Sequence, residues 1–244
     1  PVTAFMAAAT KVAAFGAALR IFYVALSGAQ WSWKPVITAV AILTMIAGSV
    51  IAIAQRDVKR MLAYSSIAHA GFLLTGVLAL NQEGLKASLF YLASYGFTTL
   101  GAFALVTLVR DSSGEVTDLN RWVGLAKRSP SVALIFSIFL LSFAGIPLTA
   151  GFIGKFTIFT AAYDSGNIGV VVAGVLSSAI AAFFYIRVIV MMFFTDPEED
   201  TVTVTIPSLY TNLTIWIAAI VTIALGVFPT PILDAIASLA TFVR

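Results

Sequence analysis

The sequence predicts an all-α fold: a polytopic bundle of transmembrane helices that forms one membrane domain over residues 1–244. Hydrophobic residues make up 60% of the chain and charged residues only 10%, whereas a typical soluble domain carries about 25% charged residues. The mean hydropathy of +1.02 points the same way. Charged side chains are also absent from six long segments, at 35–55, 61–82, 87–109, 129–154, 165–186 and 201–233. This composition excludes a soluble enzyme, a nucleic-acid-binding protein and a disordered chain.

Seven membrane spans are expected, because about 20 mainly apolar residues in a helix are enough to cross a bilayer. They are predicted at 2–26, 36–56, 59–80, 86–110, 130–162, 167–195 and 206–230, followed by a short amphipathic tail helix at 231–243. Pro35 and Pro130 stand where helices should begin, since proline is tolerated in the first turn. Turns are marked by Gly84, Gly114, Gly166 and Asn167. A β-barrel would instead show alternating segments of roughly 10 residues.

The fifth span is expected to be broken near Pro147. Proline removes a backbone donor and clashes with the preceding turn, and Gly145, Gly151 and Gly154 weaken the helix further. Such breaks persist at membrane depth only where they face protein or a water-filled cavity. A break that is followed by a lysine, here Lys155, is typical of an ion or proton site. The alternative is a packing kink with Lys155 reaching an interface.

The positive-inside rule predicts the orientation. One set of connections carries most of the basic residues, namely Arg56, Lys59, Arg60, Arg110, Arg121, Lys127 and Arg128. The other set carries only Lys34 and Lys86, with Arg244 at the end of the chain. We therefore expect the N-terminus in the cytoplasm and the C-terminus outside, in a bacterial plasma membrane. Segment 115–128, which contains Trp122, is either a short interfacial helix or a solvated loop with a tryptophan anchor.

Two lysines within the spans are the candidate catalytic residues. Lys11 lies about 15 Å along the first helix, near the bilayer midplane, where a lysine costs roughly 2.5–3.5 kcal/mol on insertion scales. Lys155 lies within the broken span. A lysine ammonium is a mobile point charge whose proton affinity falls on burial, so two such groups linked by water and hydroxyls can relay protons. The alternative for Lys11 is an ion pair that merely joins two helices.

His69 is the third candidate for the proton relay. Ser65 and Ser66 lie four and three residues before it, on the same helical face. A neutral imidazole both donates and accepts, which suits a hydrogen-bonded chain between lysines, although a simple helix–helix hydrogen bond is an equal alternative. The supporting residues are taken to be Ser65, Ser66, Tyr64, Thr149, Pro147 and Lys59. For the cluster of Arg56, Asp57, Lys59 and Arg60, topology signals and local ion pairs are the favoured interpretation.

The sequence also restricts metals and partners. It contains no cysteine and one histidine, so a thiolate-bound cluster, a c-type haem or a metal site is not expected on this chain. All 11 acidic residues fall in loops or near span ends. Because buried charges are normally paired, the partners of Lys11 and Lys155 are expected outside this chain or in water. The chain opens on Pro1 without a signal peptide, which suggests the C-terminal part of a longer protein.

Three motifs resemble the antiporter-like membrane subunits of respiratory complex I. They are residues 1–11, ending in Thr10-Lys11; residues 57–71, DVKRMLAYSSIAHAG; and residues 144–156, AGIPLTAGFIGKF. The resemblance covers nearly the whole chain, and lysine at positions 11 and 155 favours the N-type subunits. It implies an inverted-repeat fold of which this chain supplies helices eight to fourteen. It also implies that Lys155 exchanges protons with the outer side and that His69 lies on a polar axis.

The function implied by the resemblance is proton translocation in the membrane arm of NADH:quinone oxidoreductase. This chain would then be part of a translocase and would carry no redox chemistry, while NADH, FMN, Fe–S clusters and quinone would bind other subunits. Its partners would be neighbouring antiporter-like and small helical subunits and the lipid bilayer, and not nucleic acid. Two alternatives remain: a subunit of an Mrp-type cation/proton antiporter, and a structural spacer of the membrane arm.

Overall fold

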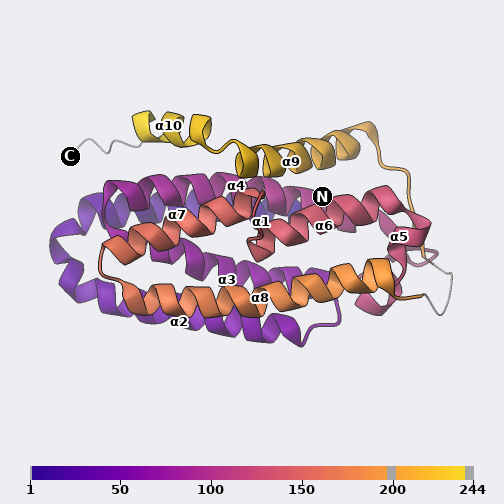
Figure 1. Ribbon diagram of the computed structural model, residues 1–244, viewed down its shortest axis with the longest axis horizontal. Helices are drawn as coiled ribbons and strands as arrows, with labels where there is room; N and C mark the ends of the chain where they lie inside the picture. Colours follow the sequence, from indigo (N-terminus) through magenta and orange to yellow (C-terminus); the bar gives the residue numbers. More distant parts are fainter. Residues whose placement is uncertain (1, 197–201, 240–244) are drawn as a thin grey trace.

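The computed structural model describes residues 2–196 and 202–239, and they form a bundle of long, roughly parallel and antiparallel helices (Figure 1). The α-helices of this part of the chain are α1 (Val2–Arg20), α2 (Gln30–Ile53), α3 (Val58–Ala79), α4 (Gln82–Val106), α5 (Leu125–Arg128), α6 (Pro130–Ala144), α7 (Ala150–Asp164), α8 (Ile168–Phe194), α9 (Leu209–Val227) and α10 (Thr230–Leu239). A π-helical turn, Ile21–Ala25, continues α1, and a 3-10 turn, Ser27–Ala29, precedes α2.

Six helical segments of the described chain are long and apolar enough to cross a membrane. They are Phe5–Ala25, Ser27–Ile53, Val58–Ala79, Gln82–Val106, Ile168–Phe194 and Leu209–Val227. The remaining predicted span, 130–162, corresponds to α6 and α7, which have 15 residues each and are separated by residues 145–149. The tail helix predicted at 231–243 corresponds to α10 as far as Leu239, and its last residues lie outside the described part of the chain.

Side-chain caps explain where several helices begin. Asp57 accepts a hydrogen bond from the Arg60 amide at 2.8 Å at the start of α3, and Asn81 accepts one from the Gly84 amide at 2.7 Å at the start of α4. Each cap satisfies an amide that the first helical turn leaves without a backbone partner. Pro130 occupies the first position of α6, as its missing donor and fixed φ angle favour.

Small residues set the closest helix packing. A side-chain carbon on Gly48 of α2 would come within 2.6 Å of the Ala68 backbone nitrogen in α3. One on Gly71 of α3 would come within 2.4 Å of the Met45 side chain in α2. The two helices therefore pack backbone to backbone, which is typical of helix pairs in membranes, where small residues allow close approach. This contact holds α3, the helix of His69, against its neighbour.

A small antiparallel sheet closes one end of the bundle, which we call the sheet end. It pairs β1 (Val109–Asp111) with β2 (Gly114–Glu115) and β3 (Thr203–Val204), in the order β2-β1-β3. Sequence analysis missed these strands, because two or three residues are too few for a periodic pattern. A 3-10 turn, Leu119–Trp122, and α5 complete this end, to the right in Figure 1.

Trp122 lies in the core of the protein, which differs from both interpretations of segment 115–128. Its side chain is fully buried, its indole nitrogen donates to the Val116 carbonyl at 2.9 Å, and its ring packs 5.1 Å from the ring of Phe136. Trp122 therefore belongs to the core and is not a surface anchor, and the segment forms a 3-10 turn and the four-residue α5 and not one interfacial helix. Tryptophan supplies a large apolar surface to the core and satisfies its single donor locally.

The opposite end of the bundle, which we call the tail end, holds α10 and two helix turns. The Asn81 side chain donates to the Ser165 hydroxyl at 3.0 Å, and the Asn167 side chain donates to the Leu78 carbonyl at 3.1 Å. These bonds join the α3–α4 turn to the α7–α8 turn. Between the two ends, the helices of the bundle bury Ser65, His69 and Lys155, which were predicted from the sequence.

Candidate functional site

The Lys155 side chain is buried in the centre of the bundle, with 5% of its surface exposed. Its Nζ atom donates to the carbonyls of Phe143 and Ala144, at 2.8 and 3.1 Å, and to the Ser178 hydroxyl at 2.9 Å. It also lies 4.8 Å from the centre of the Phe72 ring. All three hydrogen atoms of an ammonium therefore have acceptors, and the ring face adds an attractive interaction.

The backbone at the end of α6 provides the acceptors and the space for the Lys155 side chain. Gly145 ends α6 in the left-handed region, with φ of 82°, and its amide and that of Ile146 bond back to carbonyls of the last turn. Glycine adopts this conformation without strain. A side-chain carbon on Gly145 would lie 3.0 Å from Cδ of Lys155. The glycine thus ends the helix and leaves room for the lysine beside the exposed carbonyls.

The charge of Lys155 is met by a helix end. Among the described residues, none of the ion pairs includes Lys155 or Lys11. The carbonyls of Phe143 and Ala144 form the last turn of α6, where the helix dipole places about half a negative charge. A cation in such a position gains up to ~2 kcal/mol. Since a central lysine costs roughly 2.5–3.5 kcal/mol to insert, the helix end offsets a large part of this cost.

His69 and two tyrosines form a buried hydrogen-bonded cluster. His69 Nδ1 lies 2.5 Å from the Tyr91 hydroxyl, and Nε2 lies 3.4 Å from the Tyr185 hydroxyl. The Tyr185 hydroxyl also bonds the Ser65 hydroxyl. Each hydroxyl both donates and accepts, so the cluster supports more than one arrangement of its protons. The helices α3, α4 and α8 supply one or two members each.

Lys11 approaches the same face of α3 from α1. Its Nζ atom donates to the carbonyl and hydroxyl of Ser66 and, at 3.1 Å, to the hydroxyl of Tyr95. It also lies 4.7 Å from the centre of the Tyr95 ring, which is 4.8 Å from the ring of His69. Lys11 is partly exposed, whereas Ser65 and His69 are buried. The structure therefore brings Lys11 next to the His69 cluster.

Aromatic rings lie between the His69 cluster and Lys155. The rings of Phe72 and Phe143 are 5.5 and 5.4 Å from the imidazole, and these are the residues whose ring and carbonyl Lys155 contacts. One layer of side chains therefore separates His69 from Lys155, and the described residues form no direct hydrogen bond across it.

The supporting residues occupy different places. Ser65 and Ser66 contact the relay residues directly, as described. Thr149 donates to the Ile146 carbonyl at 2.7 Å and stabilises the segment between α6 and α7, in which Pro147 is exposed. Tyr64 packs against the core near the sheet end. Lys59 forms an ion pair with Glu115 at the sheet end.

Sequence analysis missed Tyr91, Tyr95, Tyr185 and Ser178. Tyr91 and Tyr95 lie one turn apart on one face of α4, in the middle of a span. Tyrosines usually gather at the membrane surfaces, where the ring is in lipid and the hydroxyl is in water. A pair of tyrosines at the centre of an apolar span was thus a usable signal for a buried polar network.

A cavity of about 370 Å³ reaches Ser66 from the sheet end. It is lined by Ala7 of α1, Phe103 of α4 and, from α3, Lys59, Arg60, Ala63 and Ser66. Two basic side chains thus border the same space as the serine that binds Lys11. Lys59, which is a predicted supporting residue, therefore lines this cavity and also forms the ion pair with Glu115.

Residues 1–181 match the family model described as NADH:quinone oxidoreductase/Mrp antiporter, TM, and the chain belongs to this family. It is an integral membrane protein of the antiporter-like class. The chain is 59% identical to NADH-quinone oxidoreductase subunit N of Rhodococcus opacus, over all of this chain and 45% of that protein. Subunit N 3 of Streptomyces griseus is also 59% identical, over all of this chain and 44% of that protein. The chain thus spans about half the length of these relatives.

Solved structures share the fold. A chain of respiratory complex I from Thermus thermophilus with bound aureothin has a TM-score of 0.73 and 31% identity, over 82% of this chain and 45% of that one. A chain of the Mrp complex from Dietzia has a TM-score of 0.85 and 23% identity, over 98% of this chain and 52% of that one. The predicted antiporter-like helical fold is therefore confirmed.

Proposed function

We propose that this chain forms part of a proton-translocating membrane-arm subunit of NADH:quinone oxidoreductase. The observation that carries the proposal is the burial of Lys155 against carbonyl and hydroxyl acceptors, with no carboxylate beside it among the described residues. A buried ionisable residue inside a membrane span is costly and is typical of an ion or proton path. The likeness to subunits N of NADH-quinone oxidoreductases supports the choice of this complex.

The proposed route begins at the cavity beside Ser66 and passes to Lys11. From Lys11 it continues through the hydroxyls of Ser66 and Tyr95 to the His69 cluster. The last step, from His69 to Lys155, crosses the layer formed by Phe72 and Phe143, and it requires water or a rotation of these rings. Protonation of one lysine disfavours protonation of the next, so a change of charge at one end biases the others.

Redox chemistry would take place on other subunits. NADH, FMN, the Fe–S clusters and quinone would bind there, and neighbouring antiporter-like subunits would transmit the driving charge. The orientation in this proposal has the sheet end in the cytoplasm and the tail end outside, in a bacterial plasma membrane, because most basic residues gather at the sheet end.

The test is the substitution Lys155→Met, and separately Lys11→Ala, in the intact complex. Each variant should lower proton pumping into vesicles and coupled quinone reduction about tenfold or more, since groups that transfer protons typically contribute at least that much. The matched control is Lys127→Met, because Lys127 is 61% exposed and ion-paired with Asp196 at the sheet end. Normal pumping by assembled Lys155→Met and Lys11→Ala complexes would contradict the role.

Two other functions give different results. A subunit of an Mrp-type cation/proton antiporter, which the Dietzia likeness favours at the level of the fold, would purify without flavin and Fe–S subunits. A structural spacer would keep wild-type proton transport in the Lys11→Ala/Lys155→Met double variant. Purification of the natural complex, followed by transport measurements on that double variant, separates all three functions.

A further inference from the structure

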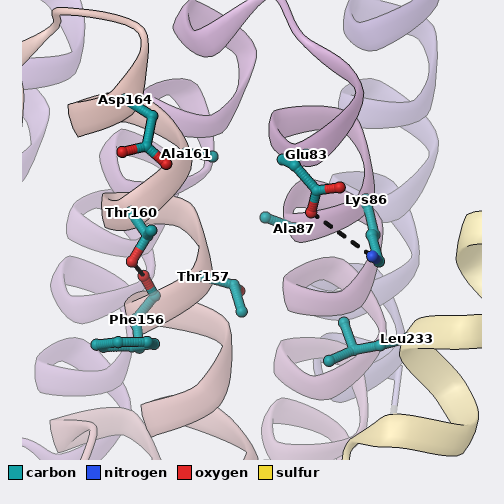
Figure 2. Close-up of a pocket in the computed structure, with 9 residues that line it drawn as sticks. All are labelled: Glu83, Lys86, Ala87, Phe156, Thr157, Thr160, Ala161, Asp164 and Leu233. Atoms are coloured by element: carbon teal, nitrogen blue, oxygen red, sulfur yellow. Dashed lines mark hydrogen bonds and ion pairs between the residues drawn. The ribbon is translucent and has the colours of Figure 1, made fainter.

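A cavity of about 250 Å³ opens at the tail end between α4, α7 and α10 (Figure 2). Glu83 and Lys86 lie on the α4 side, Asp164 and Thr160 lie on the α7 side, and Leu233 of α10 lies below Lys86, to the right in the view. The cavity is separate from the relay residues. Thr157, Thr160 and Asp164 lie on the face of α7 opposite to Lys155, because residues at i+2, i+5 and i+9 point away from residue i in a helix.

The chemical character of the residues that line this cavity changes stepwise along the axis of the bundle. Glu83 lies in the first turn of α4 and Asp164 is the last residue of α7, so both carboxylates are at the ends of their helices. Lys86 lies about 4.5 Å deeper, at 1.5 Å per residue. Phe156, which is 59% exposed, lies about 12 Å deeper than Asp164. From outside to inside, the lining therefore passes from anionic to cationic to hydroxyl to apolar.

The two threonine hydroxyls that line the cavity can only accept hydrogen bonds from a ligand. Thr160 donates to the Phe156 carbonyl at 2.9 Å, and Thr157 donates to the Ile153 carbonyl at 2.9 Å, so both hydroxyls offer acceptors only. Glu83 lies 3.5 Å from the Lys86 ammonium, whereas Asp164 has no ion pair within the described residues. The lining is complementary to a ligand that brings N–H donors to the outer rim and one anionic group to the level of Lys86.

We propose that this cavity binds a phospholipid with a primary amine headgroup, as in phosphatidylethanolamine. The ammonium lies between Asp164 and Glu83, the phosphate contacts Lys86, and an acyl chain follows Phe156 and Leu233 into the bilayer. This order of groups in the lipid matches the order of groups in the lining. The volume suits a headgroup and the upper part of a chain, since pockets for whole drug-sized ligands are about 300–1,000 Å³. The proposal does not depend on proton translocation.

The test compares lipids that differ only in the headgroup. The intact complex is reconstituted in nanodiscs of mixed phosphatidylethanolamine, phosphatidylcholine and phosphatidylglycerol, and the lipids that remain bound after detergent extraction are identified by native mass spectrometry. Phosphatidylethanolamine should be retained over phosphatidylcholine, whose trimethylated nitrogen has no N–H donor, and over phosphatidylglycerol, which has no cation. The variants are Asp164→Asn and Glu83→Gln, with Asp234→Asn as the control for an exposed carboxylate at the same end.

Asp164→Asn and Glu83→Gln should each reduce the retained phosphatidylethanolamine by about tenfold, which corresponds to 1.4 kcal/mol. Asp234→Asn should leave it unchanged. Because Glu83 and Asp164 are exposed, the fold should survive both changes, and circular dichroism checks this. Equal retention of the three lipids, or unchanged retention in Asp164→Asn, would overturn the proposal. Preferential retention of phosphatidylglycerol would overturn it as well, because it would mean that Lys86 alone attracts any phosphate.

Discussion

Tyrosine hydroxyls connect the polar residues of the site. Tyr185 touches both Ser65 and His69, and Tyr91 holds the other nitrogen of the imidazole. A buried polar network that is fully satisfied is rigid, and loss of one member leaves its partners without hydrogen bonds in an apolar surrounding. The tyrosines therefore fix the position of His69. Their hydroxyls are also the groups with which the imidazole could exchange a proton in the proposed relay.

Tyr185→Phe tests this arrangement. The change removes one oxygen and should lower proton pumping about tenfold if the route proposed above passes through the His69 cluster, because the cluster then loses the hydroxyl that joins His69 to Ser65. It should also lower the free energy of unfolding by about 1–3 kcal/mol, since Ser65 and His69 lose a buried partner. Vesicle pumping and thermal unfolding measure the two effects.

The control for Tyr185→Phe is Tyr163→Phe, which removes the same oxygen from a side chain that is 60% exposed. It should change neither pumping nor stability. Wild-type pumping in Tyr185→Phe would mean that protons bypass this hydroxyl.

At the residue level, the sequence singles out rare residue types within the spans and gives little information on common ones. A lysine or histidine within an apolar span stands out, so Lys11, His69 and Lys155 were selected from the sequence alone. The contacts of Tyr185 join α8 to α3, more than 100 residues apart in the chain. No local pattern carries that information, and the same is true of Ser178 beside Lys155.

At the scale of elements, the segment between α6 and α7 is held in place by α9. A side-chain carbon on Gly226 of α9 would lie 2.4 Å from the Leu148 carbonyl oxygen and from the Thr149 carbonyl carbon. Leu148 itself has a positive φ of 72°, which is unfavourable for a leucine. Close backbone packing from α9 thus supports a strained segment beside the buried lysine.

Gly226→Ala should therefore destabilise the protein by about 1–3 kcal/mol, the usual cost of forcing an extra methyl into a packed position. The matched control is Gly169→Ala in α8, where an added carbon meets nothing within 4 Å. That change should be neutral or slightly stabilising, because alanine favours helix over glycine. Thermal unfolding in detergent measures both, and equal stabilities would contradict the packing argument.

The sheet end contains a pH-sensitive contact. Hydrogen bonds from Ser113, and then the guanidinium of Arg121, lower the pKa of Asp111 from its usual 3.8 to about 2. The folded state therefore binds this proton less readily than the unfolded state. The stabilisation is complete above about pH 4 and is lost as the pH falls towards 2.

Asp111→Asn should remove this dependence. The thermal midpoint of the wild type should fall between pH 4 and pH 2 more steeply than that of the variant, and the two curves should converge at the acid end. Asp234→Asn, in α10, should follow the wild type. Parallel curves for the wild type and Asp111→Asn would show that the carboxylate makes no such contribution.

On the scale of the whole molecule, the bundle has two chemically different ends. The sheet end gathers the basic connections and ties them together, for example through the bond from the Leu119 amide to the Arg56 carbonyl at 2.7 Å. The tail end carries the cavity proposed for a lipid. Because the chain lacks cysteine, single cysteines introduced at the two ends report on each end separately.

Lys127→Cys should react with a membrane-impermeant maleimide only from the cytoplasmic side, and Ser238→Cys in α10 only from the outer side. Both positions are exposed. Reaction of both cysteines from the same side would contradict an odd number of membrane crossings. Reaction of Lys127→Cys from outside and of Ser238→Cys from the cytoplasm would mean that the orientation is the opposite of the proposed one.

The long helices were predictable because apolar runs of this length have few other uses. The sheet was not, because its strands have only two or three residues and because β3 pairs with β1 from more than 90 residues further along the chain. Trp122 was misjudged for a related reason: its surroundings come from α6, which no local pattern indicates. Sequence patterns therefore revealed the membrane crossings, while the closure of the sheet end depended on contacts between distant segments.

The carbonyls that hold Lys155 stabilise a cation but are too weakly basic to take its proton. A carboxylate in the same position could accept the proton, which would give a neutral carboxylic acid and a neutral amine and would hold the proton there. With backbone oxygen atoms as partners, a proton that leaves the ammonium needs another acceptor than these two carbonyls. The end of α6 thus provides Lys155 with acceptors that do not compete for its proton, which is what the proposed relay requires.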